Sequence, residues 1–302
     1  MIAPPRIPAR VSTVRRQFDA RAARFGASAV LTREIARRLL ERLQYVRLVP
    51  NRVLDVGCGM GETRVAIRSL YPRAEWIGVD ISERMLRASE ALETRRLPSW
   101  LGGASPLRVM GDGGNLPIAG DSVDLLFSNL MLHWHPEPHS VFPEWKRVLK
   151  TDGLLMFTCF GPDTLKELRQ ATSVLPRVRA MPFVDMHDFG DMMVAAGFAT
   201  PVMDAETITM TYSSPHDLLR DVRVLGGNPR DDRSDTLPSG QQARAVLRAL
   251  EAQRRDDGQI RLTFEVAYGH AWKPQPKAAG TTAITVESVR AQLVSRNRAK
   301  SA

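Results

Sequence analysis

The chain has 302 residues, of which 43% are hydrophobic and 25% are charged, and its formal net charge is +9. These proportions are ordinary for a globular protein, and the sequence has neither an apolar run long enough to span a membrane nor a signal-peptide region. Its two cysteines, Cys58 and Cys159, suggest neither a disulfide framework nor a zinc cluster. We therefore expect a cytoplasmic protein that does not act on a membrane.

The positive charge is carried almost entirely by arginine. Six of the 42 basic residues are lysine, which leaves 36 arginines. A basic surface attracts acidic partners, but such a preference for arginine often reflects the base composition of a genome. The charge therefore permits an acidic partner without proving one.

The amino-terminal region is predicted to be a helical arm over residues 1–48. Residues 1–11 are rich in proline and arginine, and apolar residues recur at helical spacing from Thr13 to Leu48. No acidic residue precedes Asp19, as in a mitochondrial presequence, but the prolines would interrupt a presequence helix. We expect these helices to lie over the mouth of a site in the following domain, and we expect no presequence.

The central feature of the sequence is the stretch from Arg52 to Asp80. An apolar run over 53–56 predicts a buried parallel strand, and a second run over 76–79 ends on Asp80. Between them, residues 62–70 have helical spacing, with three candidate buried positions: Val65, Ile67 and Leu70. The first strand is followed by glycines at alternate positions: Gly57, Gly59 and Gly61. This order predicts the first half of a nucleotide-binding α/β unit.

The glycine spacing discriminates between cofactors. A dinucleotide fingerprint has the pattern G-x-G-x-x-G, but Glu62 occupies its final glycine position. The pattern G-x-G-x-G, with Asp55 two residues upstream, resembles motif I of class I S-adenosylmethionine-dependent methyltransferases. An NAD site and a glycine turn without a ligand are the alternatives. Asp80 is placed to accept hydrogen bonds from a ribose diol.

The remaining elements alternate as an α/β sheet requires. Ser82 is predicted to cap a helix that carries Met85, and residues 98–103 are predicted to form a loop. The strand over 107–110 ends near Asp112, whose carboxylate can reach an adenine amino group. Later strands are predicted at 122–129, 154–160, 201–212 and 260–272, and later helices at 143–150 and 186–196. Residues 213–258 are too many for a hairpin loop and should have their own structure.

Six blocks together resemble the malonyl-acyl-carrier-protein O-methyltransferase family of biotin synthesis: VLDVGCGMG, IGVDISERML, GDGGNLP, SVDLLFSNLMLHW, EWKRVLKTDGLLMFTCFGPDTLKELR and LTFEVAYGHAW. The resemblance implies a Rossmann-like, seven-stranded, mostly parallel sheet. It implies a helical cap over 213–258 above the active site. We also expect a methyltransferase core over 49–212 and 259–273 and a basic, disordered tail over 274–302.

The resemblance also implies S-adenosylmethionine as cofactor and a malonyl-carrying acyl-carrier protein as partner, with methyl transfer to the free malonyl carboxylate. The implied cofactor-binding residues are Asp55, Gly57, Cys58, Gly59, Gly61, Asp80, Ile81, Met85, Asp112, Gly113, Asn129 and Leu130. The implied substrate-binding residues are Phe25, His133 and Trp134.

Two positions depart from the family pattern. The family has a glutamine where this chain has His133, and a tyrosine that matches Phe25. A histidine before the tryptophan also occurs in a sister group of mitochondrial proteins that hydroxylate an arginine during respiratory complex I assembly. The alternatives are therefore a protein-arginine hydroxylase and a non-catalytic assembly factor.

The expected chemistry requires no general base, because a malonyl carboxylate is ionised at neutral pH. An arginine is expected to meet this carboxylate, but the sequence does not identify it. The cluster HWHPEPH has no cysteine and contains prolines, so we expect no metal and place His139 in a surface loop. Residues 128–131 lack the N-P-P-Y pattern of nucleic-acid methyltransferases, so no nucleic-acid partner is expected.

Arginines of the helical arm and of the predicted cap form two candidate docking faces for an acidic carrier protein. The alternative is that both are simply solvated helix faces. The arginines concerned are Arg15, Arg16, Arg33, Arg37 and Arg38 in the arm, and Arg220, Arg223, Arg230, Arg244 and Arg248 in the cap.

Overall fold

A computed structural model describes residues 9–94, 106–173, 175, 181–226, 228–230 and 240–276. The predicted loop at 98–103, the first eight residues and the tail from 277 lie outside the described residues. Among the residues described, no helix has the length and apolar character that crossing a membrane requires.

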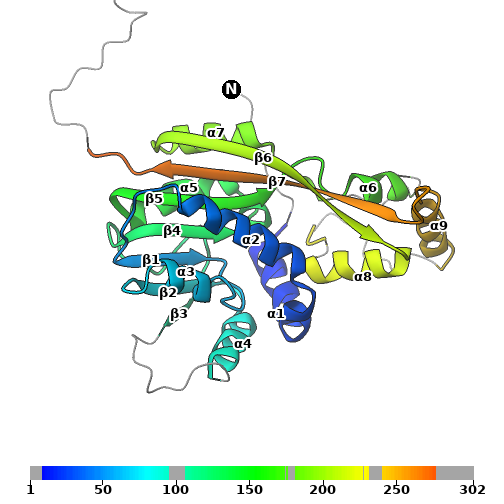
Figure 1. The fold of residues 1–302 in the computed structure, drawn as a ribbon, viewed down its shortest axis with the longest axis horizontal. Coiled ribbons are helices and arrows are strands. Elements are labelled where there is room, and N and C mark those ends of the chain that lie inside the picture. Colours follow the sequence, from blue (N-terminus) through cyan, green and yellow to red (C-terminus); the bar gives the residue numbers. More distant parts are fainter. Residues whose placement is uncertain are drawn as a thin grey trace, which may run out of the picture.

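The core is one seven-stranded sheet with the strand order β3-β2-β1-β4-β5-β7-β6 (Figure 1). The neighbouring pairs from β3 to β5 are parallel, whereas β7 is antiparallel to both β5 and β6. The strands are β1 (Arg52–Val56), β2 (Glu75–Asp80), β3 (Leu107–Met110), β4 (Val123–Asn129), β5 (Leu149–Phe160), β6 (Ala199–Tyr212) and β7 (Ile260–Trp272). The predicted Rossmann-like, mostly parallel fold is confirmed.

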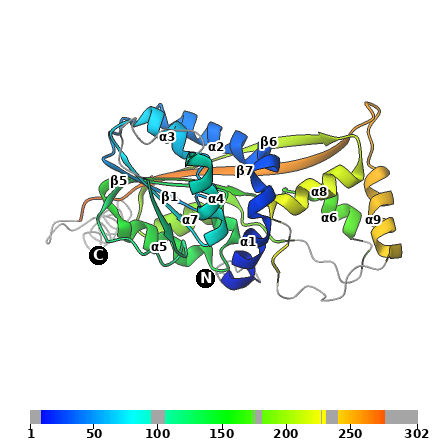
Figure 2. The same cartoon turned by 90° about the horizontal axis from the view of Figure 1, so that it is seen from below.

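Helices cover both faces of the sheet, which explains why its central strands are apolar along most of their length. On one face, α2 (Val30–Leu43) packs through Ile35 and Leu39, next to α3 (Arg64–Leu70). On the other face, α5 (Pro138–Val148) and α7 (Met186–Ala195) pack through Trp145 and Phe189. Figure 2 shows these two layers on opposite sides of the strands.

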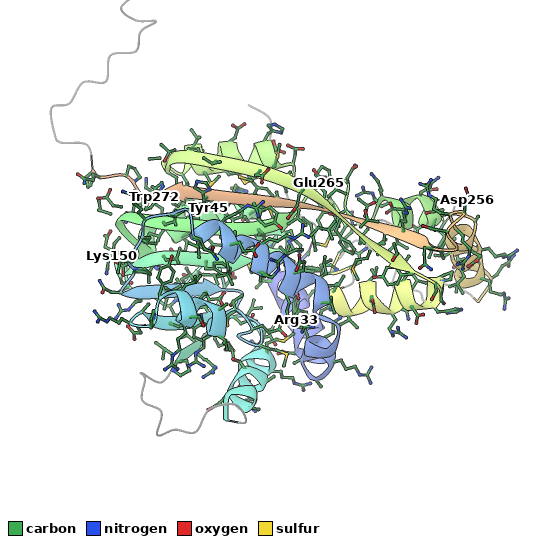
Figure 3. All side chains as sticks on the ribbon, viewed as in Figure 1. Arg33, Tyr45, Lys150, Asp256, Glu265 and Trp272 are labelled. Carbon is green, nitrogen blue, oxygen red and sulfur yellow. The ribbon has the colours of Figure 1, made fainter. Side chains whose placement is uncertain are left out.

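The remaining helices surround the carboxyl ends of the parallel strands. They are α1 (Val11–Ser28), α4 (Glu83–Thr94), the 3-10 turn η2 (Leu132–Trp134), α6 (Lys166–Thr172), α8 (Pro215–Leu225) and α9 (Gly240–Glu251). β6 and β7 run past the other strands to reach α6, α8 and α9 (Figure 1). In Figure 3, Asp256 marks this extended end, and Tyr45, Lys150 and Trp272 mark the opposite end of the sheet.

The predicted cap at Ser82 is confirmed. The Ser82 hydroxyl accepts the Met85 N–H at 3.2 Å and so caps the start of α4. Gly197, at φ +77°, follows the end of α7 in the left-handed conformation that glycine adopts most readily.

The predicted burial of α3 is wrong at two of its three positions. Ile67 is buried, but Val65 is 57% exposed and Leu70 is 37% exposed. Val65 and Ile67 are two residues apart, so they project from nearly opposite sides of a helix. A helix of only two turns can bury little more than one of these sides, and Ile67 occupies it.

The predicted boundary of α5 is also wrong. The helix begins at Pro138, five residues before the predicted start, and Pro143 lies inside it. A proline at the first helical position lacks an N–H that would have no intrahelical partner, so Pro138 starts the helix at no cost. His139 therefore lies on this helix and is half-buried, not in a surface loop as predicted.

Candidate active site

A cavity of about 620 Å³ lies at the carboxyl ends of β1, β2, β4 and β5, beneath α1 and α2. This is the edge at which open α/β sheets bind ligands. Every residue that the sequence predicts for the cofactor or the substrate lines this cavity, except Gly61. The structure thus brings together positions from Phe25 to Trp134, while their individual roles remain predictions.

The three glycines of the turn have different surroundings. All have positive φ, at +75° for Gly57, +52° for Gly59 and +69° for Gly61. A Cβ atom on Gly57 would lie 2.5 Å from Met131, and one on Gly61 would lie 2.6 Å from the Ser89 hydroxyl. A Cβ on Gly59 would meet no described atom within 4 Å. Gly57 and Gly61 therefore permit close packing, whereas Gly59 presents bare backbone to the cavity.

Two buried acids flank this turn. Asp55 is 1% exposed and accepts a hydrogen bond from the Thr63 hydroxyl, and burial raises its pKa to about 7. Asp80 accepts the N–H groups of Gly59 and Ser82, both at 2.8 Å. Burial also raises the pKa of Asp80, to about 6. Each oxygen of Asp80 keeps a second lone pair that can accept a further hydrogen bond.

Because Asp55 is buried, we expect its contribution to the stability of the folded protein to fall as pH rises. Its pKa is raised from 3.8 to about 7, so the unfolded chain releases this proton first. The contribution of Asp55 to stability is therefore full below pH 4 and is lost between about pH 4 and pH 7. Asp55→Asn should remove this dependence, and the stability of the variant relative to wild type should rise by up to about 4 kcal/mol between pH 4 and pH 8.

Urea titrations at each pH would measure the effect of Asp55→Asn. The matched control is Asp256→Asn, because Asp256 is an exposed carboxylate that does not line the cavity and lies at the end of the molecule to which β6 and β7 extend (Figure 3). A stability difference between Asp55→Asn and wild type that stays constant with pH would contradict the assignment.

Asp112 lies just beyond β3 on the same sheet edge. It accepts the Gly114 N–H at 2.9 Å, and its oxygen lies 3.5 Å from His135 Nε2. The hydrogen bond with His135 is the main cause that lowers the pKa of Asp112. Gly113 is held beside it, because its carbonyl accepts the Trp145 indole N–H at 3.0 Å. Asp112 thus presents an ionised carboxylate at the place predicted for adenine.

Asn129 connects the end of β4 to the covering helix α2. Its amide donates to the Thr32 carbonyl at 3.1 Å, and its side-chain oxygen accepts the Thr158 hydroxyl at 2.8 Å. The next residue, Leu130, has φ +55° and donates its N–H to Thr158 at 3.0 Å. The Asn129 side chain is thus already engaged, so its clearest contribution is to hold α2 over the cavity.

His133 forms part of an aromatic wall on the other side of the cavity. Its ring centroid lies 4.8 Å from Phe160, 4.9 Å from Trp134 and 5.9 Å from Phe183. The side chain is fully buried, and burial lowers its pKa to about 3, so the imidazole is neutral. Within the described residues, neither ring nitrogen has a hydrogen-bond partner. The neutral ring of His133 therefore offers one N–H donor and one nitrogen acceptor to a ligand.

The aromatic wall continues onto α1. The Trp134 ring meets Phe18 edge-on at 5.4 Å, and Phe18 meets Phe25 at 6.3 Å. Sequence reasoning missed Phe18 and Phe160 as site residues. The signal for Phe18 was present, because Val14, Phe18 and Phe25 share the apolar stripe of a helix predicted to lie over the site.

The basic residues of α1 and α2 are largely paired with carboxylates. Arg33 projects from α2 beside α1 (Figure 3) and pairs with Glu62 at 3.1 Å, which closes α2 over the glycine turn. Four further ion pairs are Arg15–Asp19, Arg37–Glu34, Arg38–Glu206 and Arg220–Asp217. For these residues, the pairing favours the solvated-face interpretation over a docking face.

Among the described residues, no group of three histidine, cysteine or acidic side chains is arranged to hold a metal ion.

Comparisons with a family model and with curated proteins both relate this chain to methyltransferases. A family described as "Methyltransferase domain" matches residues 54–157. The Malonyl-[acyl-carrier protein] O-methyltransferase of Gallionella capsiferriformans is 44% identical over 270 residues, which cover 87% of this chain and 91% of that protein. The protein of the same name from Laribacter hongkongensis is 42% identical and covers 87% and 89%.

Among solved structures, the YcgJ protein of a Bacillus species superposes with a TM-score of 0.57 at 18% identity. The match covers 80% of this chain and all of that one, and at this identity it shows a shared fold alone. The sequence relatives, by contrast, are similar along nearly their whole length. The chain therefore belongs to the malonyl-[acyl-carrier protein] O-methyltransferase family.

Proposed function

We propose that this protein transfers a methyl group from S-adenosylmethionine to the free carboxylate of malonyl-acyl-carrier protein, a step of biotin synthesis. The observation that carries the proposal is the 44% identity to a named family member over 87% of the chain. The cavity at the carboxyl edge of the sheet supports it, because the residues of the family's cofactor motifs converge there.

The residues of the cavity fit the methyl donor. Gly59 leaves open space above its backbone, and Asp80 keeps lone pairs for two ribose hydroxyls. Asp112 follows β3, two strands away from the glycine turn along the same edge, and lines the same cavity, where it could accept a hydrogen bond from an adenine amino group. When bound, S-adenosylmethionine supplies a methyl group that is already activated on a positively charged sulfur.

The chemistry is a single in-line displacement. A malonyl carboxylate oxygen would form a bond to the methyl carbon while the carbon–sulfur bond breaks, and the electron pair of the broken bond would stay on sulfur. The products are a methyl ester and S-adenosylhomocysteine, and no proton has to move. The protein therefore contributes to the reaction by positioning the two reactants and by excluding water from them. The aromatic wall of Phe18, Phe160 and Trp134 supplies the dry surface, and the neutral His133 imidazole can donate a hydrogen bond to a malonyl oxygen.

The named relatives do not favour the alternatives. The curated relatives reported above are called methyltransferases, and each match covers 87% of this chain. A protein-arginine hydroxylase or a non-catalytic assembly factor is therefore the weaker interpretation of His133.

The carrier protein and the cap belong to the same proposal. We assign residues 213–258, which include α8 and α9, as the cap over the substrate side, because α8 contributes Leu225 to the cavity. We assign residues 1–48 as the arm that covers the cavity, because α1 and α2 line it. A cytoplasmic location accords with a bacterial biosynthetic enzyme whose partner is an acyl-carrier protein.

A transfer assay tests the function directly. The purified protein is incubated with methyl-labelled S-adenosylmethionine and malonyl-acyl-carrier protein, and the product is treated with mild alkali. Label released as methanol is expected, because a methyl ester hydrolyses under these conditions. Absence of transfer by a protein that still binds the donor would contradict the proposal. Acetyl-acyl-carrier protein, which lacks the free carboxylate, is the control substrate.

The open space above Gly59 predicts a specific loss of donor binding. Gly59→Ala should weaken S-adenosylmethionine binding about tenfold, because its methyl group enters the space that the donor needs. The matched control is Gly258→Ala, since Gly258 also has positive φ, at +75°, and meets nothing within 4 Å, but lies outside the cavity. Both variants should lose about 1 kcal/mol of stability through the left-handed backbone. Titration calorimetry giving equal donor affinity for both variants would refute the assignment.

A further inference from the structure

A second chamber of about 240 Å³ lies next to the main cavity, between α6, α8 and β7. It shares three wall residues with the main cavity: Trp134, Phe160 and Leu225. These side chains form a partition between the two spaces. Figure 2 shows α6, α8 and α9 gathered at the end of the molecule where the long strands β6 and β7 extend.

The proposed reaction, on which this inference rests, needs a route through that partition. The malonyl carboxylate must lie beside the methyl donor, whereas the other end of the malonyl group is joined by a thioester to the prosthetic arm of a protein too large to enter. Along the sheet edge the order is β2, β1, β4, β5, so Asp80 and the glycine turn lie on one side and Phe160 lies on the other. The donor is expected on the first side, and the second chamber begins beyond Phe160.

The lining of the second chamber suits a flexible chain of methylene and amide groups, which is the chemistry of a carrier protein's prosthetic arm. Most of its wall is apolar, and these residues are Leu165, Leu168, Met181, Phe183, Val222 and Phe264. Such a wall favours the methylene groups of the arm. The hydroxyl of Thr164 donates to the Glu265 carbonyl at 3.0 Å, and that of Thr172 donates to the Leu168 carbonyl at 2.9 Å. These hydroxyl protons are therefore engaged.

Arg169 supplies a cation in this chamber. Its guanidinium donates to the Pro162 carbonyl, and no carboxylate among the described residues pairs with it. A partly buried guanidinium without a carboxylate retains N–H donors for an incoming oxygen. The helix that carries it is fixed on its other side, because Glu167 accepts the Thr263 N–H at 2.9 Å. Leu165, at φ +60°, begins this helix and donates its N–H to the Thr263 carbonyl at 2.7 Å.

We propose that the second chamber is the subsite for the thioester-linked arm of the carrier protein, and that Arg169 donates hydrogen bonds to an oxygen of that arm. The arm enters between α6 and α8 and passes Trp134, and the malonyl group extends beyond it to the methyl donor. The chamber therefore selects acyl groups that are carried on an arm over free malonate and short malonyl esters.

Filling the chamber tests the route. Val222→Trp and Thr172→Trp place a ring in it, and the readout is the ratio of kcat/KM for malonyl-acyl-carrier protein to that for malonyl ethyl thioester, which lacks the arm. The ratio should fall about tenfold, which corresponds to ~1.4 kcal/mol. Val194→Trp is the control, since Val194 is 59% exposed on α7. Calorimetric titration with S-adenosylmethionine verifies that each variant is folded.

Arg169 is tested with the same two substrates. Arg169→Leu should raise KM for the carrier substrate about tenfold, and Arg169→Lys should recover part of this loss because it restores the charge. The proposal is overturned if both tryptophan variants keep the wild-type ratio, or if Arg169→Leu keeps the wild-type KM. If the wild-type protein methylates neither substrate although it binds the donor, the proposed function itself has failed.

Discussion

Asp80→Ala is expected to weaken S-adenosylmethionine binding by at least 100-fold, which corresponds to ~2.7 kcal/mol. The Asp80 carboxylate does two things that alanine cannot. It fixes the glycine turn by accepting the Gly59 N–H at 2.8 Å, and it offers free lone pairs where we predict the ribose of the donor to bind. Hydrogen bonds to a charged group contribute about 1.5–3 kcal/mol, so the loss of this one carboxylate accounts for the expected effect.

Calorimetry on three variants separates these contributions of Asp80. Asp80→Asn retains an acceptor oxygen for the turn but has no charge, so its affinity should fall between wild type and Asp80→Ala. The control is Glu83→Ala, because Glu83 is exposed in the first turn of α4 and pairs only with the exposed Arg87 among the described residues. Donor affinity of Asp80→Ala within threefold of wild type would rule out the ribose assignment.

His133→Leu is expected to lower kcat/KM for malonyl-acyl-carrier protein about 100-fold while the folded state becomes more stable. The imidazole is fully buried, and neither nitrogen has a partner within the described residues. Replacing a buried, unsatisfied polar group with an apolar one of similar size should stabilise the protein by about 1–3 kcal/mol. A gain in stability together with a loss of activity would identify a residue retained for binding substrate.

His133→Gln is the informative companion variant. Its amide keeps both a donor and an acceptor at this position, and the family resemblance places glutamine there, so activity should stay within about tenfold of wild type. The buried imidazole has its pKa lowered to about 3, so it contributes stability above pH 6.5 that is lost as pH falls. Both variants should lose this acid sensitivity. Equal activity of the Leu and Gln variants would exclude a hydrogen bond to substrate.

The convergence of most of the predicted cofactor residues on one cavity could be predicted because their signals are local in the sequence. Gly57, Gly59 and Asp80 lie within one strand, turn, helix and strand, and each apolar run had to become a buried strand. The predicted bounds of β7, Ile260–Trp272, coincide with those of the structure for the same reason. The errors at Val65 and Leu70 concern side-chain direction, which depends on what a short helix packs against.

The acceptor half was decided by tertiary structure. Trp134 follows β4, yet it packs against Phe18 of α1 and covers Gly226 after α8, where an added Cβ would lie 2.1 Å from its ring. No spacing rule connects residues so distant along the chain, because their contact depends on how helices pack across the sheet edge. The same holds for Arg169, which is one of 36 arginines in the sequence. The sequence by itself determined the fold and the sheet edge at which the cavity lies, and only packing decided which residues line the proposed acceptor side of that cavity.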